Sequence, residues 1–474
     1  MRKYRNILFY VLVTASLLFA MYKIVGEGQP LETSKITKFS TAGSSGIADF
    51  FSGRFLHNSS GSLSVLLLQI IAIIFTARVF GFLFRKIGQP TVIGEIAAGI
   101  FLGPSVLGLT FPSYNAFLFP QNSLGILQLF TQLGLMLFMF VVGMEVDLKI
   151  LKSKAGNAIV ISHASIIIPY TMGMGLAYFL YKKYAPANTD FLSFSLFIGI
   201  AMSITAFPVL ARIIKERNMG STRIGNLAIT CAAADDITAW CILAAVISIA
   251  KAGSAMSALF TIALSILYVL AMFKIMRPIL QKITNKWFYK ENLTVNMLAF
   301  MIGILLISSF ITELIGIHAL FGAFLAGVIM PSTNNFRRLL IERTEYISIT
   351  LLLPLFFAFS GLRTQIGLLN TIDAWMVCAA ILIVAIAGKF GGSFFAAKFV
   401  GESWKDSIII GALINTRGLM ELVVLNTGYD LGIISSEIFT MMVIMVLVTT
   451  CMTGPILNLM KTRGVSSPET EVQS

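Results

Sequence analysis

Long apolar segments follow one another along almost the whole chain. Each is roughly 18 to 27 residues long, and a helix of about 20 residues crosses the ~30 Å hydrocarbon core of a bilayer. Charged residues make up 12% of the chain, well below the ~25% of typical soluble domains. We therefore predict an all-α polytopic membrane protein with fourteen helices, at 6–25, 63–84, 90–110, 124–146, 156–182, 192–214, 223–250, 254–275, 294–311, 314–331, 346–368, 373–399, 406–428 and 436–460.

The basic residues that give the net charge of +13 lie in alternate loops. The stretches 212–217, 274–290 and 337–343 fall on the same side as the N-terminus if the loops alternate across a membrane. The positive-inside rule makes that side cytoplasmic. We expect both termini to be cytoplasmic, in the inner (plasma) membrane of a bacterium, and we expect no nucleic-acid partner.

The two ends of the chain differ in composition from its middle. Residues 1–62 begin with a basic and apolar stretch like that of a signal peptide, but Lys23 follows without a clean cleavage site. We interpret them as an uncleaved signal-anchor helix and an extracytoplasmic linker, with a membrane domain at 63–460 and a short cytoplasmic tail at 461–474. Neither a G-x-G-x-x-G nor a G-x-x-x-x-G-K-[ST] motif is present, so no cofactor is expected.

The thirteen helices that follow the first one divide into six, a linker helix at 254–275, and six. Because the linker is a single helix, the second six helices have the opposite orientation in the membrane to the first six. Inverted repeats place binding sites near the bilayer midplane, between helices that are broken at corresponding positions. The fifth helices of the two halves, 192–214 and 406–428, both contain residues that interrupt or weaken a helix. We therefore predict two broken, crossing helices at Ser203 and Pro208 and at Asn415, Thr416, Arg417, Gly418 and Glu421.

Asp235 and Asp236 are adjacent in an otherwise apolar segment. An ionised Asp at the centre of a membrane helix costs about 2.5–3.5 kcal/mol, so such residues usually face water or a partner. Lys389, flanked by glycines in 373–399, is the expected partner. Neighbours on a helix point about 100° apart, so one Asp can pair while the other faces an aqueous cavity. The group is either an ion and proton site or a stabilising cluster. Buried ion pairs add little stability for the cost of desolvating their charges, which favours the ion and proton site.

Other polar residues leave alternatives open. Arg417 and Glu421 are spaced for an ion pair along one helix, which either braces the break or contributes to ion coordination. Glu95 is either a water-facing acid or an attractor for cations. His163 and His318 are core histidines or pH sensors. The four cysteines form no C-x-x-C pair, and no nucleophile–base or metal constellation is evident, so we do not expect an enzyme.

Several motifs together resemble the monovalent cation:proton antiporter family 2, which holds bacterial Na⁺/H⁺ and K⁺/H⁺ antiporters and plant cation/H⁺ exchangers. The resemblance covers about 63–460. The motifs are QPTVIGE at 89–95, GPSVLG at 103–108, GLMLFMFVVGMEVDL at 134–148, SITAFPVLARIIKE at 203–216, AADDITAW at 233–240, GIHALFGAFLAGVIMP at 316–331, LLPLFFAFSGLRT at 352–364 and NTRGLMELVVLNTG at 415–428.

The resemblance implies a homodimer that exchanges Na⁺ or K⁺ for H⁺ by an elevator-type movement. A scaffold (63–146 and 294–368) would hold a mobile core (156–250 and 373–460). Asp236 would bind the monovalent cation or the proton, Asp235 would pair with Lys389, and Thr205, Asn415 and Thr416 would line the crossing. A K⁺ efflux system that behaves like a channel is the alternative; a membrane enzyme or receptor is a more distant one.

Overall fold

A computed structural model describes residues 62–145, 155–217, 219–220, 222–252, 255–287, 293–331 and 335–461. The predicted anchor helix and linker, and the tail after Lys461, lie outside these residues. Every element of the described residues is a helix. The first half contains α3 (Ser62–Lys86), α4 (Thr91–Leu102), α5 (Leu107–Thr110), α6 (Pro112–Leu118), α7 (Gln121–Glu145), α9 (Ala155–Tyr184), α10 (Phe191–Ser203), α11 (Phe207–Glu216) and α12 (Arg223–Ala252).

Two connecting helices, joined by a short π-helical segment, precede the second half, which contains two more π-helical segments. In chain order these elements are α13 (Ala255–Ala271), η1 (Met272–Met276), α14 (Arg277–Trp287), α15 (Val295–Ile315), α16 (Ala319–Val328), α17 (Phe336–Ile347), η2 (Ser348–Leu352), α18 (Leu353–Leu362), the 3₁₀ turn η3 (Ile366–Leu368), α19 (Ile372–Ile386), η4 (Ala387–Gly391), α20 (Gly392–Phe399), α21 (Trp404–Ile414), α22 (Leu419–Asp430) and α23 (Ser436–Lys461).

The all-α polytopic architecture is confirmed. Within the described residues, ten helices are long and apolar enough to cross a membrane, or eleven if the bent pair α21 and α22 counts as one span. The predicted count of thirteen stays a prediction. Two predicted spans fall short of the length of a full crossing: 192–214 is divided by an extended segment, and 314–331 contains only the ten-residue α16.

The predicted boundary between 294–311 and 314–331 was wrong by a few residues. α15 continues to Ile315 because Gly316, with a φ of 97°, supplies the left-handed residue that ends the helix. The ring of His318 then accepts a hydrogen bond from the amide of Leu320 and caps α16. His318 itself has a φ of 82°, which is uncommon for a residue other than glycine.

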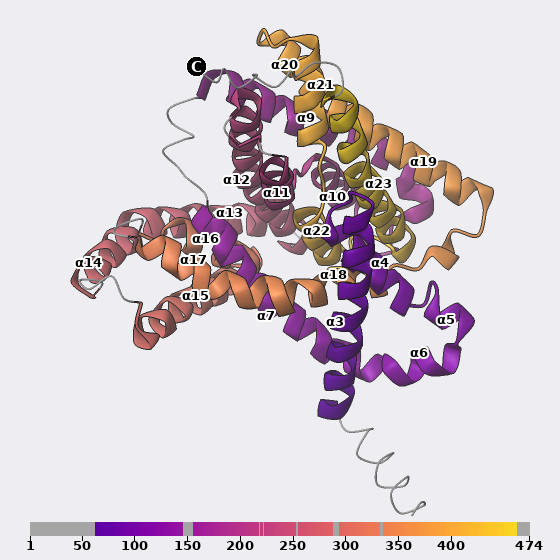
Figure 1. The fold of residues 1–474 in the computed structure, drawn as a ribbon, viewed down its shortest axis with the longest axis horizontal. Helices are drawn as coiled ribbons and strands as arrows, with labels where there is room; N and C mark the ends of the chain where they lie inside the picture. The colour runs from indigo at the N-terminus through magenta and orange to yellow at the C-terminus, as the bar shows by residue number, and fades with distance from the viewer. Residues whose placement is uncertain are drawn as a thin grey trace, which may run out of the picture. The chain divides into compact units, whose positions relative to one another are not determined.

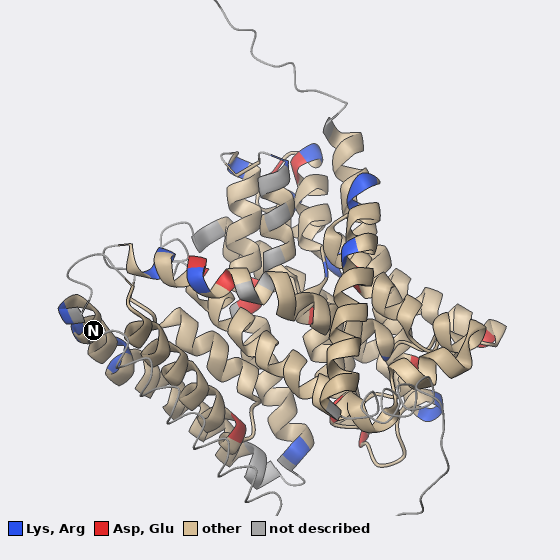
Figure 2. Cartoon of the chain, turned by 60° about the horizontal axis from the view of Figure 1, so that its bottom comes forward, with Lys and Arg blue, Asp and Glu red and all other residues tan. Residues whose placement is uncertain are grey.

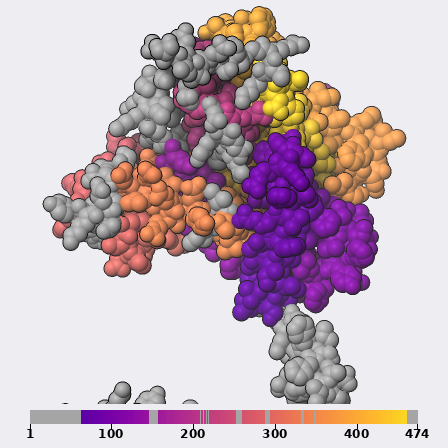
Figure 3. Space-filling model, viewed as in Figure 1, coloured from indigo at the N-terminus to yellow at the C-terminus, as the bar shows by residue number. Residues whose placement is uncertain are grey.

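The outer surface has the composition expected of a membrane protein. Most of the ribbon in Figure 2 is uncharged, and the Lys, Arg, Asp and Glu residues lie mainly near helix ends. α3 forms a large part of the face seen in Figure 3, and its Leu67, Ile71 and Phe75 are exposed. Apolar side chains on the outside of a helical bundle fit lipid rather than water.

Two sets of helices pack mainly among themselves (Figure 1). In one set α4 contacts α3 and α18, and α7 contacts α16 and α18. In the other set α9 contacts α10, α12 and α20, while α23 contacts α19, α21 and α22. The sets meet where α22 touches α18 and where α23 touches α4. Both broken helices belong to the second set.

Candidate functional site: a crossing of two broken helices

The breaks in the two discontinuous helices touch each other. Residues 204–206 separate α10 from α11, and residues 415–418 separate α21 from α22, which are bent by 42°. The backbone amide of Ala206 donates a hydrogen bond to the carbonyl oxygen of Thr416 at 3.1 Å. A Cβ on Gly418 would lie 2.9 Å from Cγ2 of Val209, so glycine permits this close approach. The breaks therefore cross in direct backbone contact.

The first break lies just before Pro208 rather than around it. Ile204 is extended, with φ −72° and ψ 138°, and α11 begins at Phe207. Pro208 thus occupies the first turn of α11, where a helix does not need the amide hydrogen that proline lacks. Phe207 is helical although a following proline disfavours helical geometry at the residue before it. The extended backbone at 204–206 is held by its contact with the second break.

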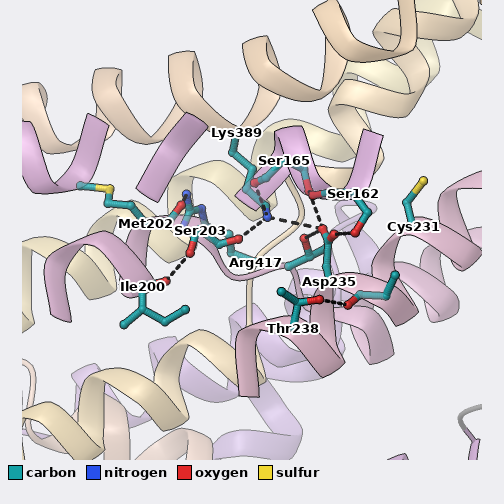
Figure 4. Close-up of polar contacts among 12 residues, drawn as sticks. Ser162, Ser165, Ile200, Met202, Ser203, Cys231, Asp235, Thr238, Lys389 and Arg417 are labelled. Carbon is teal, nitrogen blue, oxygen red and sulfur yellow. Dashed lines mark hydrogen bonds and ion pairs between the residues drawn. The ribbon is translucent and has the colours of Figure 1, made fainter. Parts of the chain in front are cut away.

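Two buried cations satisfy the free carbonyl groups at the end of α10. Arg417 donates hydrogen bonds to Ala201 O at 3.1 Å and to Met202 O at 2.7 Å, and Lys389 donates to Ser203 O (Figure 4). The last carbonyls of a helix have no partner within it and carry partial negative charge. Arg417 and Lys389 therefore cap a helix that ends inside the protein.

Arg417 also forms the predicted pair with Glu421. The two side chains are fully buried, and Nη1 of Arg417 lies 2.7 Å from Oε1 of Glu421. Thr450 of α23 donates a hydrogen bond to the carbonyl of Arg417 at 2.8 Å, so the backbone of this break is satisfied as well. These contacts indicate a bracing role for Arg417 and Glu421 at the crossing.

Asp235 is saturated with donors (Figure 4). Its Oδ1 accepts a hydrogen bond from Ser162 at 2.5 Å, and its Oδ2 accepts from Ser165 at 2.7 Å and from Thr205 at 2.6 Å. Nζ of Lys389 lies 3.7 Å from Oδ2. Thr205, predicted to act at the ion site, thus contacts the first acid of the pair.

Ser162 and Ser165 were not anticipated from the sequence. They are spaced three residues apart on α9, so both face Asp235 from the same side of that helix. Ser165 also accepts, through its carbonyl oxygen, a hydrogen bond from Lys389 at 3.1 Å. The sequence signal that could have identified them is two hydroxyl residues three positions apart in a helix that was predicted to belong to the core.

Asp236 has the opposite surroundings. Its side chain is buried, with 1% exposure, and neither of its oxygens has a hydrogen-bond partner among the residues that the structure describes. A charged carboxylate is very costly to bury without donors or a cation. Asp236 is therefore suited to carry either a proton or a bound cation. Asn415 Oδ1, at the second break, also lacks a donor within the described part of the chain.

Lys389 lies in a π-helical segment that the sequence did not reveal. η4 follows α19 directly and is buried against α9. A Cβ on Gly388 would lie 2.8 Å from Cα of Pro169, so glycine allows the two backbones to pack closely. Single π-helical turns are frequent at functional sites because they redirect the side chains that they carry. Here the redirected side chain reaches the end of α10.

A cavity of about 560 Å³ leads toward the crossing from one side. Residues of α3, α4 and α7 line one part of it, and Val209, Ala211 and Leu419 of α11 and α22 line another. Leu419 follows the second break directly, and Val209 lies in the first turn after the first break. Glu95, Glu145 and Glu345 lie in its wall together with Arg78 and Arg85. Water and ions that enter this cavity thus come close to the crossing.

Comparison with known proteins agrees with this architecture. Residues 71–460 match the family model described as "Sodium/hydrogen exchanger, transmembrane". The chain belongs to this family. It is 43% identical over 398 residues to the Na(+)/H(+) antiporter NhaS4 of Synechocystis, covering 84% of this chain and 97% of that relative. The integral membrane nature of this exchanger family member follows from the match and from its apolar helices.

Eukaryotic relatives and a solved structure extend the likeness. Cation/H(+) antiporter 17 of Arabidopsis thaliana is 38% identical over 83% of this chain, and K(+)/H(+) antiporter 1 of Saccharomyces cerevisiae is 33% identical over 85%. The chain spans about half the length of these two proteins, 48% and 47%. The sodium proton antiporter MjNhaP1 of Methanocaldococcus jannaschii shares the fold, with a TM-score of 0.63 at 13% identity over 85% of this chain and 99% of that one.

Proposed function

We propose that this exchanger moves a monovalent cation, K⁺ or Na⁺ or both, across the membrane in exchange for H⁺. The observation that carries the proposal is the contrast between two adjacent acids. Asp235 has three hydroxyl donors and a lysine, whereas Asp236 is buried with no hydrogen-bond partner in the described residues. The names of the relatives, which are Na⁺/H⁺, K⁺/H⁺ and cation/H⁺ antiporters, support the same activity.

Coupling arises because Asp236 takes one of two ligands at a time. A proton neutralises its carboxylate covalently, and a cation neutralises it electrostatically, so each displaces the other. The bare carboxylate is disfavoured inside the protein. The site therefore crosses the membrane loaded with one or the other, and a full cycle exchanges them.

The movement that we propose is of elevator type. The core, 156–250 and 373–460, carries Asp236 and both broken helices, and the scaffold, 63–146 and 294–368, supplies α3, α4 and α7. The cavity described above lies between these two parts. A shift of the core along the scaffold would close this cavity and open another at the opposite end. Two copies form a homodimer in this proposal, as the family resemblance implies.

In this proposal the exchanger lies in the inner membrane of a bacterium, and its basic loops favour an orientation with both termini and the cavity on the cytoplasmic side. Arg78, Arg85 and Glu145 lie at the cavity end of their helices. Glu95, Glu145 and Glu345 then face the cytoplasm and attract cations to the cavity. In this proposal Glu95 therefore acts as an attractor for cations.

Exchange in everted membrane vesicles tests this function. A pH gradient is imposed, Na⁺, K⁺ and Li⁺ are titrated across pH, and the membrane potential is either clamped or free. We expect the addition of K⁺ or Na⁺ to dissipate the pH gradient at rates typical of carriers. The flux of H⁺ and the flux of the cation should have a fixed ratio. Cation flux that continues without counter-movement of H⁺ would contradict exchange and would indicate a K⁺ channel.

A further inference from the structure

A second polar cluster joins the proposed scaffold to the proposed core. Arg363 follows α18, and its Nη1 lies 2.7 Å from Oδ1 of Asp430 at the end of α22. Gln128 of α7 donates a hydrogen bond to Oδ2 of the same carboxylate at 2.9 Å. Asn426 of α22 accepts from Arg363 at 3.0 Å and donates to Ser360 of α18 at 2.8 Å. Three helices are thereby tied together by side chains.

The cluster lies at the end opposite to the cavity. On α7, Glu145 lines the cavity and Gln128 belongs to the cluster, about 25 Å apart along the helix axis at 1.5 Å per residue. On α22, Leu419 and Asp430 are about 16 Å apart in the same sense. α18 likewise runs from Leu353 in the cavity wall to Arg363. α7 and α18 pack against each other, and α22 is thus separated from them by the cavity at one end and tied to them by side chains at the other.

Among the described residues, little space remains at the tied end. A space of about 20 Å³ remains beside the cluster, lined by Leu135, Phe356, Val423 and Thr427 among others. That volume holds about one water molecule, because a water needs at least ~10–15 Å³. The guanidinium of Arg363 also lies over the rings of Phe359 and Tyr429, with its central carbon 4.5 and 5.4 Å from the ring centres. The guanidinium of Arg363 and these two rings therefore cover the tied end of the space between the helices.

The ion pair is suited to open and close. The side chain of Arg363 is 17% exposed and that of Asp430 is 31% exposed, so water can replace each partner when the pair separates. Separating partners that water can reach costs less than separating a fully buried pair, which leaves charges without compensation. The pair of Arg417 and Glu421 at the crossing has no such exposure. The Arg363–Asp430 pair is therefore easier to separate than the Arg417–Glu421 pair.

We infer that Arg363, Asp430, Gln128 and Asn426 form a latch that closes the extracytoplasmic path while the cavity is open. The latch rests on the proposed exchange and on its moving core, and it must separate before Asp236 can face the other side. Its residues act on the population of the two states and do not touch the ion. Neutralising one partner should favour the state in which the cavity is closed.

Cysteine labelling with a membrane-impermeant maleimide tests the latch on the full chain with its four native cysteines replaced. One reporter is Thr427→Cys beside the latch, and the other is Ala211→Cys in the cavity wall. In Asp430→Asn we expect the labelling rate of Thr427→Cys from outside to rise about fivefold. The labelling rate of Ala211→Cys from the cytoplasmic side should fall, because a population shift toward one state depletes the other. The exchanged pair, Arg363→Asp with Asp430→Arg, should restore both rates.

Arg223→Gln provides the matched control, because Arg223 pairs with Glu402 and Asp406 inside the proposed core and should leave both labelling rates unchanged. Equal increases at both reporters in Asp430→Asn would show general loosening and would overturn the latch, as would two unchanged rates. The labelling does not depend on transport. If the two labelling rates change in opposite directions but the protein shows no exchange, the latch is supported and the proposed function is refuted.

Discussion

At the scale of residues, the site consists of one satisfied acid beside one unsatisfied acid. Asp235 and Asp236 are neighbours on α12, and the turn of about 100° between them directs one toward Lys389 and the hydroxyls of α9 and leaves the other without donors in the described structure. The first acid compensates the charge of Lys389. The second is available for a ligand.

Replacing Asp235 should therefore destabilise the protein. Asp235→Asn leaves the buried ammonium of Lys389 without its carboxylate, and removal of one partner from a buried ion pair costs about 3 kcal/mol or more. Ser162→Ala, which removes one hydrogen bond to the same acid, should cost about 1 kcal/mol. Thermal unfolding in detergent measures both. Asp235→Asn melting at the wild-type temperature would contradict the assigned role.

At the scale of elements, the crossing depends on close backbone contacts made by glycine. Gly388→Ala would place a Cβ 2.8 Å from Cα of Pro169 and force η4 away from α9. Overpacking of this kind costs about 1–3 kcal/mol, and it would move Lys389 away from Asp235 and the end of α10. We expect a lower melting temperature and slower exchange.

Gly391→Ala is the matched control for this change. It lies in the same π-helical segment, but a Cβ there would meet nothing within 4 Å. Alanine is a better helix former than glycine by up to about 1 kcal/mol, so this variant should be as stable as the wild type or slightly more so. A loss of stability in Gly391→Ala equal to that in Gly388→Ala would contradict the packing argument.

The sequence predicted the helices from their hydropathy and the two breaks from proline, glycine and charged residues at matching repeat positions. It placed Lys389 opposite the Asp pair because few other partners were available inside the membrane. It did not predict the role of Arg417 as a cap for α10, because that contact joins residues more than two hundred positions apart. Nor did it identify the latch, since Arg363 and Asp430 are both near helix ends, where charges are common.

At the scale of the whole molecule, the cavity that leads toward the crossing lies at one end of the described residues. The cavity of about 560 Å³ opens beside the two breaks, while the opposite ends of α7, α18 and α22 are tied by the latch residues. An exchanger must keep one side closed while the other is open, because simultaneous access would let the cation leak. The described residues thus combine an open cavity at one end with side-chain contacts across the same helices at the other.

In the proposed exchange, a single carboxylate, that of Asp236, carries both the cation and the proton. The most direct measurement is exchange driven by a pH gradient in proteoliposomes containing Asp236→Asn, which keeps the size of the side chain but binds neither a proton nor a cation as a carboxylate does. We predict a loss of exchange by at least about tenfold for every cation that the wild type moves, equivalent to about 1.4 kcal/mol or more. Exchange at the wild-type rate in this variant would contradict the role proposed for Asp236.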